Sequence, residues 1–203
     1  MTDDLGFDVS RETSDRFELF AELVKKWNPK INLVSRTSLE ELWTRHILDS
    51  LQIYQAVDDP RGHWVDIGSG GGFPGLIVAI MAKENNGIER LTLVESDQRK
   101  CAFLRTALRE LECSGVVVCD RIENLPPLDA DILSARALSD LTALLEHAER
   151  HLSAEGLCVF AKGATWQKEL KNAQTKWRFG CQIVNSVTNT AAATLKISGV
   201  SRV

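Results

Sequence analysis

A glycine-rich segment contains the residues best suited to chemistry in this chain. Asp66 comes first, and five of the eight residues at 68–75 are glycines. An apolar run typical of a short strand precedes the segment, and a second apolar run that suits a buried helix follows it. Glycine adopts backbone conformations closed to other residues and lets a ligand approach the main chain closely. The segment therefore predicts a nucleotide-type site at the carboxyl edge of a parallel sheet.

Two ligands are compatible with this segment. Residues 70–75 satisfy the dinucleotide fingerprint G-x-G-x-x-G, whereas residues 66–72 satisfy D-x-G-x-G-x-G, a motif typical of enzymes that bind S-adenosylmethionine (SAM). Pro74 can begin a helix but removes one N–H donor from its first turn. A pyrophosphate uses such donors, and the zwitterionic methionine half of SAM needs them less. The segment favours SAM over NAD, and a glycine loop that only makes a tight turn is the third alternative.

In the SAM interpretation, specific residues of the segment receive roles. Gly70 and Gly72 lie under the methionine half of SAM, where side chains would obstruct the cofactor. Asp66 orients either the loop itself or the ammonium group of the ligand. The cofactor prediction is therefore SAM, with these three residues beside it.

A second acidic residue ends the next apolar run. The stretch 91–94 is Leu-Thr-Leu-Val, and Glu95 follows it directly. This is about the distance beyond a glycine-rich turn at which a βαβ unit places the acid that binds ribose hydroxyls. A solvated surface glutamate is the simpler alternative. Because Glu95 is paired with the glycine-rich segment, the ribose role is favoured, although it suits SAM and NAD equally.

Helices and strands alternate regularly along the chain. A helix with an apolar stripe from Phe17 to Trp27 is predicted to end before Asn28-Pro29. A capping box that begins at Ser38 predicts the start of a second helix. The further predicted elements are a strand at 64–68, a helix from Pro74, a strand at 91–95, a helix at 101–111, strands at 116–119 and 131–133, a helix at 140–152, a strand at 157–161, a basic helix, and a hairpin of 183–184 with 195–197.

This alternation predicts an α/β fold. Strand–helix repetition implies a doubly wound, mostly parallel seven-stranded sheet of the class I SAM-methyltransferase (Rossmann-like) type. A closing antiparallel hairpin is typical of these methyltransferases and not of dehydrogenases. We expect residues 1–60 to form an N-terminal helical extension and residues 61–203 to form the methyltransferase domain as a single compact unit.

Composition narrows the class of protein. The chain has 203 residues, of which 44% are hydrophobic and 26% charged, as in an ordinary globular protein. The start of the chain is acidic, and no apolar run reaches membrane length. Five cysteines without C-x-x-C spacing predict reduced thiols and no metal site. We expect a cytoplasmic protein that does not contact a membrane and is a monomer by default.

Charge is distributed unevenly along the chain. The net charge is −4, yet residues 162–203 hold seven of the 24 basic side chains and only one of the 28 acidic ones. Overall acidity therefore restricts where a nucleic acid could bind without excluding one. The candidate patch contains two tryptophans among its basic residues, and a solvated helix face explains the same charges. Its members are Lys162, Trp166, Lys168, Lys171, Lys176, Trp177 and Arg178.

The end of the fourth predicted strand restricts the reaction. Enzymes that methylate exocyclic amines carry [DN]-P-P-[YF] there, and this chain has Ser134-Ala135-Arg136-Ala137. Pyrimidine-C5 methylases need a cysteine nucleophile near that strand end, where this sequence has none. Guanine N7 has a lone pair and no proton, so its methylation needs alignment and no general base. The sequence is compatible with this acceptor and also with some oxygen and small-molecule acceptors.

Three motifs in order carry a family resemblance. They are KWN at 26–28 with INLVS at 31–35, RHILDS at 45–50, and DIGSGGGFPG at 66–75. Together they resemble the RsmG (GidB) family of bacterial 16S ribosomal RNA guanine-N7 methyltransferases. The resemblance extends through Glu95, Arg136 and residues 161–163, and covers most of residues 25–165. The final forty residues resemble the family poorly.

The resemblance implies an activity and a set of site residues. It implies SAM-dependent methylation of guanine N7 in 16S ribosomal RNA, either as free RNA or in the assembling small ribosomal subunit. It also implies that Gly68 and Phe73 line the SAM pocket, that Ile122 and Glu123 flank the adenine, and that Arg136 closes the site.

Four residues are candidates for the substrate site. Arg136 follows the fourth predicted strand, at the switch point of the sheet, where its guanidinium could contact a phosphate or the O6/N7 edge of guanine. The alternative for Arg136 is a structural pair with a carboxylate such as Asp49. His46 lies on the apolar side of its helix, which favours a core histidine over a base. Lys162, at the end of the fifth predicted strand, is a candidate phosphate contact.

Three hypotheses of function follow. The first is SAM-dependent guanine-N7 methylation of small-subunit ribosomal RNA. The second is an NAD(P)-binding Rossmann oxidoreductase, which the literal G-x-G-x-x-G motif allows, although no hydride-transfer constellation accompanies it. The third is a non-catalytic regulator that binds SAM or RNA, which only a turnover measurement separates from the first.

Overall fold

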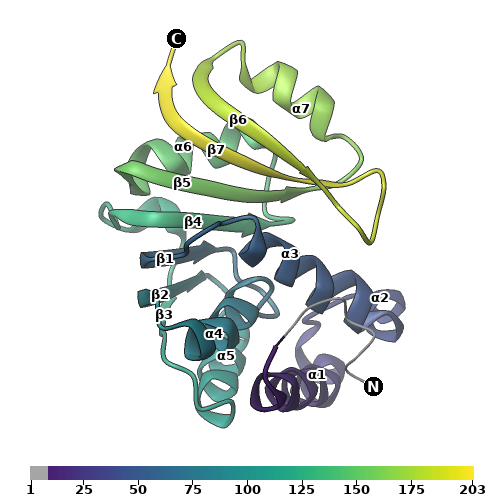
Figure 1. Cartoon of the computed structure of the whole chain (residues 1–203). Coiled ribbons are helices and arrows are strands. Elements are labelled where there is room, and N and C mark those ends of the chain that lie inside the picture. Colours follow the sequence, from purple (N-terminus) through teal and green to yellow (C-terminus); the bar gives the residue numbers. More distant parts are fainter. Residues whose placement is uncertain (1–8) are drawn as a thin grey trace.

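A single seven-stranded sheet organises the chain. The computed structural model describes residues 9–203, and the order of the strands is β3-β2-β1-β4-β5-β7-β6 (Figure 1). Strands β1 to β5 pair in parallel, and β7 runs antiparallel to both β5 and β6. The predicted mostly parallel, doubly wound fold with a closing antiparallel hairpin is confirmed. The bounds are β1 (Gly62–Ile67), β2 (Ile88–Glu95), β3 (Val116–Cys119), β4 (Ala130–Arg136), β5 (Leu152–Lys162), β6 (Trp177–Asn185) and β7 (Ala193–Arg202).

Helices cover both faces of this sheet. Those before β1 are α1 (Arg11–Ile31), α2 (Arg36–Glu40), the π-helix η1 (Trp43–Leu48) and α3 (Asp49–Gln55). Those that follow β1 are α4 (Gly75–Asn85), α5 (Gln98–Glu110), the 3₁₀-helix η2 (Ile122–Asn124), α6 (Leu141–His151) and α7 (Trp166–Ala173).

Two apolar cores lie against opposite faces of the sheet. Strand residues alternate between the faces, so Trp64 packs with α1, α3, α4 and α5 in one core while Val65 packs with α6 in the other. Helix α1 contributes Phe17 and Phe20, both fully buried, to the same core as α4 and α5. The helices before β1 therefore share a core with α4 and α5. Figure 1 shows α1 beside α4 and α5. The division at residue 60 into an extension and a domain stays a prediction, and residues 1–8 lie outside the described part.

The predicted end of the first helix is wrong. Helix α1 continues through Pro29 to Ile31. A proline in the last turn removes only one hydrogen bond, and other contacts compensate for it. Asn32 adopts a left-handed conformation with φ 55° and donates its N–H to the carbonyl of Asn28. The Asn28 side chain in turn accepts a hydrogen bond from the N–H of Val34 at 2.9 Å, which fixes the turn after the helix.

The predicted capping box at Ser38 is also wrong. Ser35 caps α2, because its hydroxyl accepts a hydrogen bond from the N–H of Ser38 at 3.1 Å. The single helix expected from Ser38 is divided into α2, η1 and α3. The π-helix between them is a rare conformation that occurs often at functional sites.

Candidate active site

The glycine-rich loop crosses the carboxyl end of β1. The N–H groups of Gly68 and Ser69 both donate to the carbonyl of Val94 on β2, at 2.9 and 3.1 Å. Gly68, Gly70 and Gly72 have positive φ angles of 68°, 55° and 88°. Gly71 is needed for a close approach, because a Cβ there would lie 3.1 Å from the carbonyl oxygen of Leu33. The segment after α1 therefore packs directly on the loop.

Asp66 lies beneath the loop and is fully buried. Its Oδ2 accepts a hydrogen bond from the N–H of Gly75 at 3.2 Å, and its Oδ1 accepts one from the hydroxyl of Ser134 at 2.7 Å. Ser134 also accepts a hydrogen bond from Nε1 of Trp64. Burial raises the pKa of Asp66 to about 6, and the hydrogen bond from Ser134 opposes this rise. Of the two roles predicted for Asp66, the contacts match the one that orients the loop.

Glu95 ends β2 beside the loop. Its Oε2 accepts a hydrogen bond from the N–H of Gly70, and its Oε1 accepts one from the N–H of Asp97, both at 2.8 Å. Each oxygen keeps a lone pair for a further donor. The carboxylate therefore fixes the loop and still faces the adjoining cavity.

A cavity of about 600 Å³ opens above the loop. We call it the loop cavity. Its volume suits a nucleotide-sized ligand. Most of the predicted cofactor residues line it, namely Gly68, Gly70, Phe73, Glu95, Ile122, Glu123 and Arg136. Asp66 and Gly72 do not line it and lie behind its wall.

Several residues that line the loop cavity were not predicted from the sequence. Leu33 and Val34 arrive from the turn after α1, and Lys100 arrives from α5. Asp120 and Arg121 follow β3. The first two belong to the INLVS motif at 31–35, for which no role was predicted. The other three depend on how the loops fold over the sheet edge.

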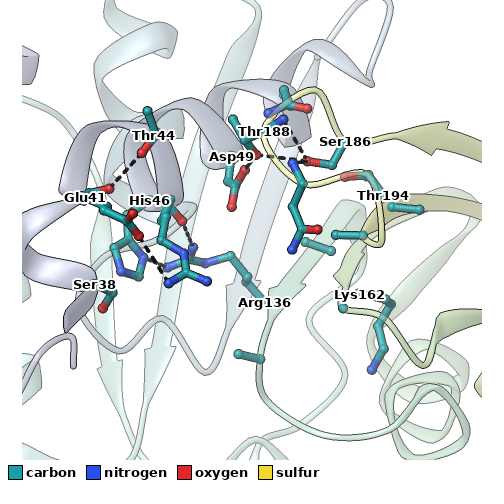
Figure 2. Close-up of a pocket in the computed structure, with 18 of the residues that line it drawn as sticks. Ser38, Glu41, Thr44, His46, Asp49, Arg136, Lys162, Ser186, Thr188 and Thr194 are labelled. Carbon is teal, nitrogen blue, oxygen red and sulfur yellow. Dashed lines mark hydrogen bonds and ion pairs between the residues drawn. The ribbon is translucent and has the colours of Figure 1, made fainter. Parts of the chain in front are cut away.

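A second cavity of about 750 Å³ adjoins the first (Figure 2). We call it the hairpin cavity, because the tip between β6 and β7 forms one side of it. His46, Arg136 and Ala137 line both cavities. Asp49 and Lys162 line the hairpin cavity and not the loop cavity. The structure thus brings the four predicted substrate-site residues around one cavity.

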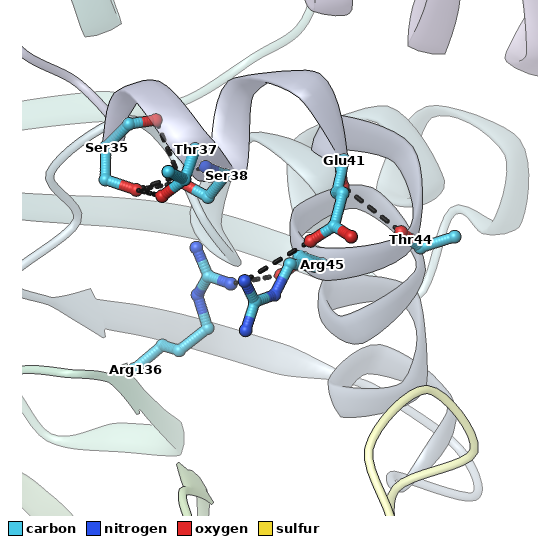
Figure 3. A network of polar contacts seen from close by, with 7 residues as sticks. All are labelled: Ser35, Thr37, Ser38, Glu41, Thr44, Arg45 and Arg136. Atoms are coloured by element: carbon cyan, nitrogen blue, oxygen red, sulfur yellow. Dashed lines mark hydrogen bonds and ion pairs between the residues drawn. The ribbon is translucent and has the colours of Figure 1, made fainter.

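Arg136 and His46 form the shared wall between the two cavities. Arg136 is the last residue of β4, which continues beyond the predicted strand at 131–133 to include it. It donates to the backbone carbonyl of Arg45 at 3.0 Å (Figure 3) and lies 2.5 Å from Nδ1 of His46. Its guanidinium carbon lies 5.2 Å from the ring centroid of Phe73, and the His46 ring lies 4.9 Å from the same centroid.

The protonation states of this wall follow from its burial. Burial, together with the charges of the neighbouring Arg136 and Arg45, lowers the pKa of His46 to about 3. His46 is therefore neutral near pH 7, with Nδ1 as the acceptor and the proton on Nε2. Burial lowers the pKa of Arg136 to about 10, so the guanidinium stays charged. The wall is a cation supported by a neutral imidazole.

Asp49 and Lys162 differ in how they are bound. Asp49 accepts a short hydrogen bond from the hydroxyl of Thr188 at the hairpin tip and makes no ion pair with Arg136. The structural pair that was the alternative for Arg136 is therefore not formed. Lys162 pairs with Glu169 at 2.6 Å and donates to the carbonyl of Ser139 at 2.7 Å. Its ammonium group is thus already engaged within the protein.

The two tryptophans of the C-terminal basic patch pack against the apolar core. Trp177 is 2% exposed and packs in the core with α6, and Trp166 packs against the same core. The guanidinium of Arg202 lies over the Trp177 ring. The Trp177 ring is therefore not available to stack on a base, whereas Trp166 is half-buried.

Residues 9–203 provide neither a metal site nor a membrane-spanning helix. The side chains of histidine, cysteine and acidic residues form no group of three suited to a metal ion. In this range no helix has the length and apolar character needed to span a membrane. All five cysteines are free thiols.

The fold and the loop define a class of protein. A seven-stranded sheet with an antiparallel β7, a glycine-rich loop after β1 and a carboxylate at the end of β2 characterise the class I fold of SAM-dependent methyltransferases. A SAM-dependent methyltransferase from Aquifex aeolicus aligns with a TM-score of 0.59 at 13% identity, covering 96% of this chain and 98% of that one. A methyltransferase from Geobacter sulfurreducens aligns with a TM-score of 0.61 at 17% identity, covering 97% of this chain and 92% of that one. At these identities the likeness shows the fold.

Sequence comparison gives the family. The family model described as "GidB: rRNA small subunit methyltransferase G" matches residues 13–197. Ribosomal RNA small subunit methyltransferase G from Ruegeria sp. (strain TM1040) is 57% identical over 98% of this chain and 97% of that protein. The protein of the same name from Ruegeria pomeroyi is 58% identical over 96% of this chain and 95% of that protein. The chain belongs to the rRNA small subunit methyltransferase G family.

These matches confirm one prediction and correct another. The predicted family and its SAM-dependent methyltransferase activity are confirmed, which leaves the NAD(P) oxidoreductase without support. The expectation that the final forty residues resemble the family poorly is wrong, since the match continues through residue 197. Strands β6 and β7 are therefore part of the family's fold.

Proposed function

We propose that this protein transfers the methyl group of SAM to N7 of a specific guanine in 16S ribosomal RNA. The observation that carries the proposal is the wall of Arg136 and His46, which separates the loop cavity from the hairpin cavity. A cofactor in the first cavity and a base in the second would meet there. The names of the relatives, which specify small-subunit ribosomal RNA, support the acceptor.

The loop cavity fits SAM in its size and its polar groups. SAM supplies an electrophilic methyl group on a sulfonium centre. Gly68 and Gly70 would present a main chain without side chains to the methionine half, and Glu95 would accept hydrogen bonds from the ribose hydroxyls. Ile122 and Glu123, which line the same cavity, would hold the adenine. Asp66 and Gly72 act from behind the wall by holding the loop in shape.

The chemistry of the shared wall suits an acceptor that needs no base. His46 is neutral and its Nδ1 is engaged by Arg136, so it is poorly placed to remove a proton. Guanine N7 has no proton to lose, and its lone pair lies in the plane of the ring. Catalysis then depends on alignment of N7 with the methyl group. The Arg136 guanidinium can contact O6 of the base or a neighbouring phosphate.

The partner follows from the same assignment. The substrate is 16S ribosomal RNA, either free or in the assembling small subunit, and such a substrate places the protein in the cytoplasm. We infer that it acts as a monomer, because the residues proposed to hold the cofactor and the base need no contribution from a second copy.

Transfer of label tests the proposal. Purified protein is incubated with methyl-labelled SAM and, separately, with small subunits, large subunits and free 16S ribosomal RNA from cells that lack the enzyme. We expect label in the small-subunit substrates and none in large subunits. Tight SAM binding without label in any substrate would support the non-catalytic regulator. NADH fluorescence titration provides the check on the dinucleotide alternative and should show no binding.

A further inference from the structure

Three carboxylates line the hairpin cavity, and two of them form ion pairs with basic side chains. Glu41 forms an ion pair with Arg45 at 3.3 Å. Glu169 pairs with Lys162 at 2.6 Å and also accepts hydrogen bonds from Leu141 and Thr165. Asp49, within the part of the chain that the structure describes, forms no ion pair. The free carboxylate of this cavity is therefore Asp49. Burial raises the pKa of its carboxyl group, and the hydrogen bond from Thr188 and the charges of Arg136 and Arg45 oppose this rise.

The hairpin tip leaves this carboxylate only partly satisfied. The hydroxyl of Thr188 donates to Oδ1 of Asp49, and no donor in residues 9–203 bonds to Oδ2. The tip is held a second time where the N–H of Val187 donates to Oε1 of Gln52 at 2.8 Å. Half-buried and without an ion pair, Asp49 has unused capacity to accept hydrogen bonds. Figure 2 shows Asp49 and Thr188 facing each other at one side of the cavity.

One base matches a free carboxylate better than the others. Guanine presents two adjacent donors on its Watson–Crick edge, N1–H and the 2-amino group, and a carboxylate can accept both. Adenine, cytosine and uracil each place an acceptor next to a donor on that edge. Side chains commonly read unstacked RNA bases on this edge. A carboxylate in a base-sized cavity therefore selects guanine.

We propose that Asp49 selects the target guanine by accepting hydrogen bonds from its N1–H and 2-amino groups. This inference rests on the proposed function and adds a specificity residue to it. N7 lies on the edge of the purine opposite the 2-amino group. A guanine held by Asp49 therefore directs N7 toward Arg136 and His46, which separate the hairpin cavity from the loop cavity. Asp49 follows His46 by three residues, so both lie on one side of the helical segment.

The same contact assists the product. Methylation at N7 moves the positive charge from the sulfonium to the purine and leaves a neutral thioether. A carboxylate at the Watson–Crick edge interacts favourably with that new charge. Positive charge on the ring also makes N1–H a stronger donor, so the bond to Asp49 strengthens as the methyl group arrives.

The test removes the 2-amino group of the target guanine. Small subunits are reconstituted with inosine, which lacks the 2-amino group, in place of the target guanine, and single-turnover rates of methyl transfer are measured with enzyme in excess. Wild-type protein should prefer guanine over inosine by roughly 10- to 100-fold, as expected for a lost hydrogen bond to a charged group. In Asp49→Asn the preference should fall to about threefold or less, and single-turnover rates keep the ratio measurable in a slow variant.

A control variant separates base recognition from the hairpin contact. Thr188→Val removes the hydroxyl bound to Asp49 and leaves the carboxylate in place, so it should keep the full preference for guanine. An unchanged preference in Asp49→Asn, or its loss in Thr188→Val alone, would overturn the inference. So would wild-type protein that methylates both substrates equally. Failure of wild-type protein to methylate the guanine subunits would instead contradict the proposed function.

Discussion

Arg136 reaches from the end of β4 to within 2.5 Å of Nδ1 of His46, and the two side chains share the ring of Phe73. His46 lies in the π-helix η1, and Phe73 lies in the glycine-rich loop. The contact therefore joins the helices before β1, the loop and the centre of the sheet at one point. It also fixes His46 in its neutral form beside the proposed methyl-transfer path.

His46 should remain neutral across the range in which the enzyme is active. Burial and the adjacent Arg136 lower its pKa to about 3. Because the folded pKa lies below that of the unfolded chain, this group contributes stability that is complete above about pH 6.5 and is lost as the pH falls toward 3. NMR of the imidazole carbons should show no titration of His46 between pH 8 and pH 5. A midpoint near 6.5 would contradict the Arg136 contact.

Replacement of Arg136 should affect catalysis more than folding. Arg136→Ala should lower kcat/KM by roughly 100-fold, because the cation beside the base is lost, while the free energy of unfolding falls by about 1–2 kcal/mol. Arg202→Ala is the matched control, since Arg202 also lies over an aromatic ring and lines neither cavity. Methyl-transfer rates and chemical denaturation measure the two effects. Proportional losses in rate and stability would indicate a structural role for Arg136.

A side chain at Gly70 should abolish cofactor binding. Gly70 has φ 55°, donates to Glu95 and lines the loop cavity. In Gly70→Val the branched side chain is strained at this φ and occupies the cofactor's place, so SAM affinity should fall by at least about 100-fold. Calorimetric titration measures it, with Gly180→Val on the edge strand β6 as the control that binds SAM normally. Unchanged SAM affinity in Gly70→Val would show that the cofactor binds elsewhere.

Asp66 should make the protein more stable at mildly acidic pH. Its pKa is raised from 3.8 to about 6 in the folded state, so folding takes up a proton between these values. The stability gained from the protonated group is complete below about pH 3.8 and is lost as the pH rises through about 6. The unfolding free energy of wild-type protein minus that of Asp66→Asn should therefore increase by on the order of 3 kcal/mol from pH 7 to pH 4. A difference independent of pH would show that Asp66 has an ordinary pKa.

The sheet and the loop could be predicted because their signals are local. The strand–helix alternation, the five glycines at 68–75 and the acid at Glu95 are visible within short windows of sequence. The two local errors both concern helix ends. Val34 donates to the side chain of Asn28 and stabilises the end of α1, and Ser35 rather than Ser38 caps α2.

The rest of the site depends on contacts between distant segments. Leu33 reaches the loop because Gly71 leaves room for its carbonyl, and the motifs that contain these two residues do not show that they meet. Thr188 lies 139 residues from Asp49 in the chain, and only the antiparallel return of β7 brings them together. Lys162 lies at the end of a predicted strand, where a phosphate contact was expected, yet its ammonium group forms an ion pair with Glu169. Residue type predicted which side chains matter, and tertiary structure decided which of them are free.

The position of the transferred methyl group tests the central claim most directly. Small ribosomal subunits that lack the modification are incubated with the protein and methyl-labelled SAM, and the 16S ribosomal RNA is digested to nucleosides for mass spectrometry. The account predicts label as N7-methylguanosine from a single position of the RNA. Label on an exocyclic amine, a ribose hydroxyl or a pyrimidine carbon would contradict it, because the account places guanine N7, and no other atom, beside the methyl group at the wall of Arg136 and His46.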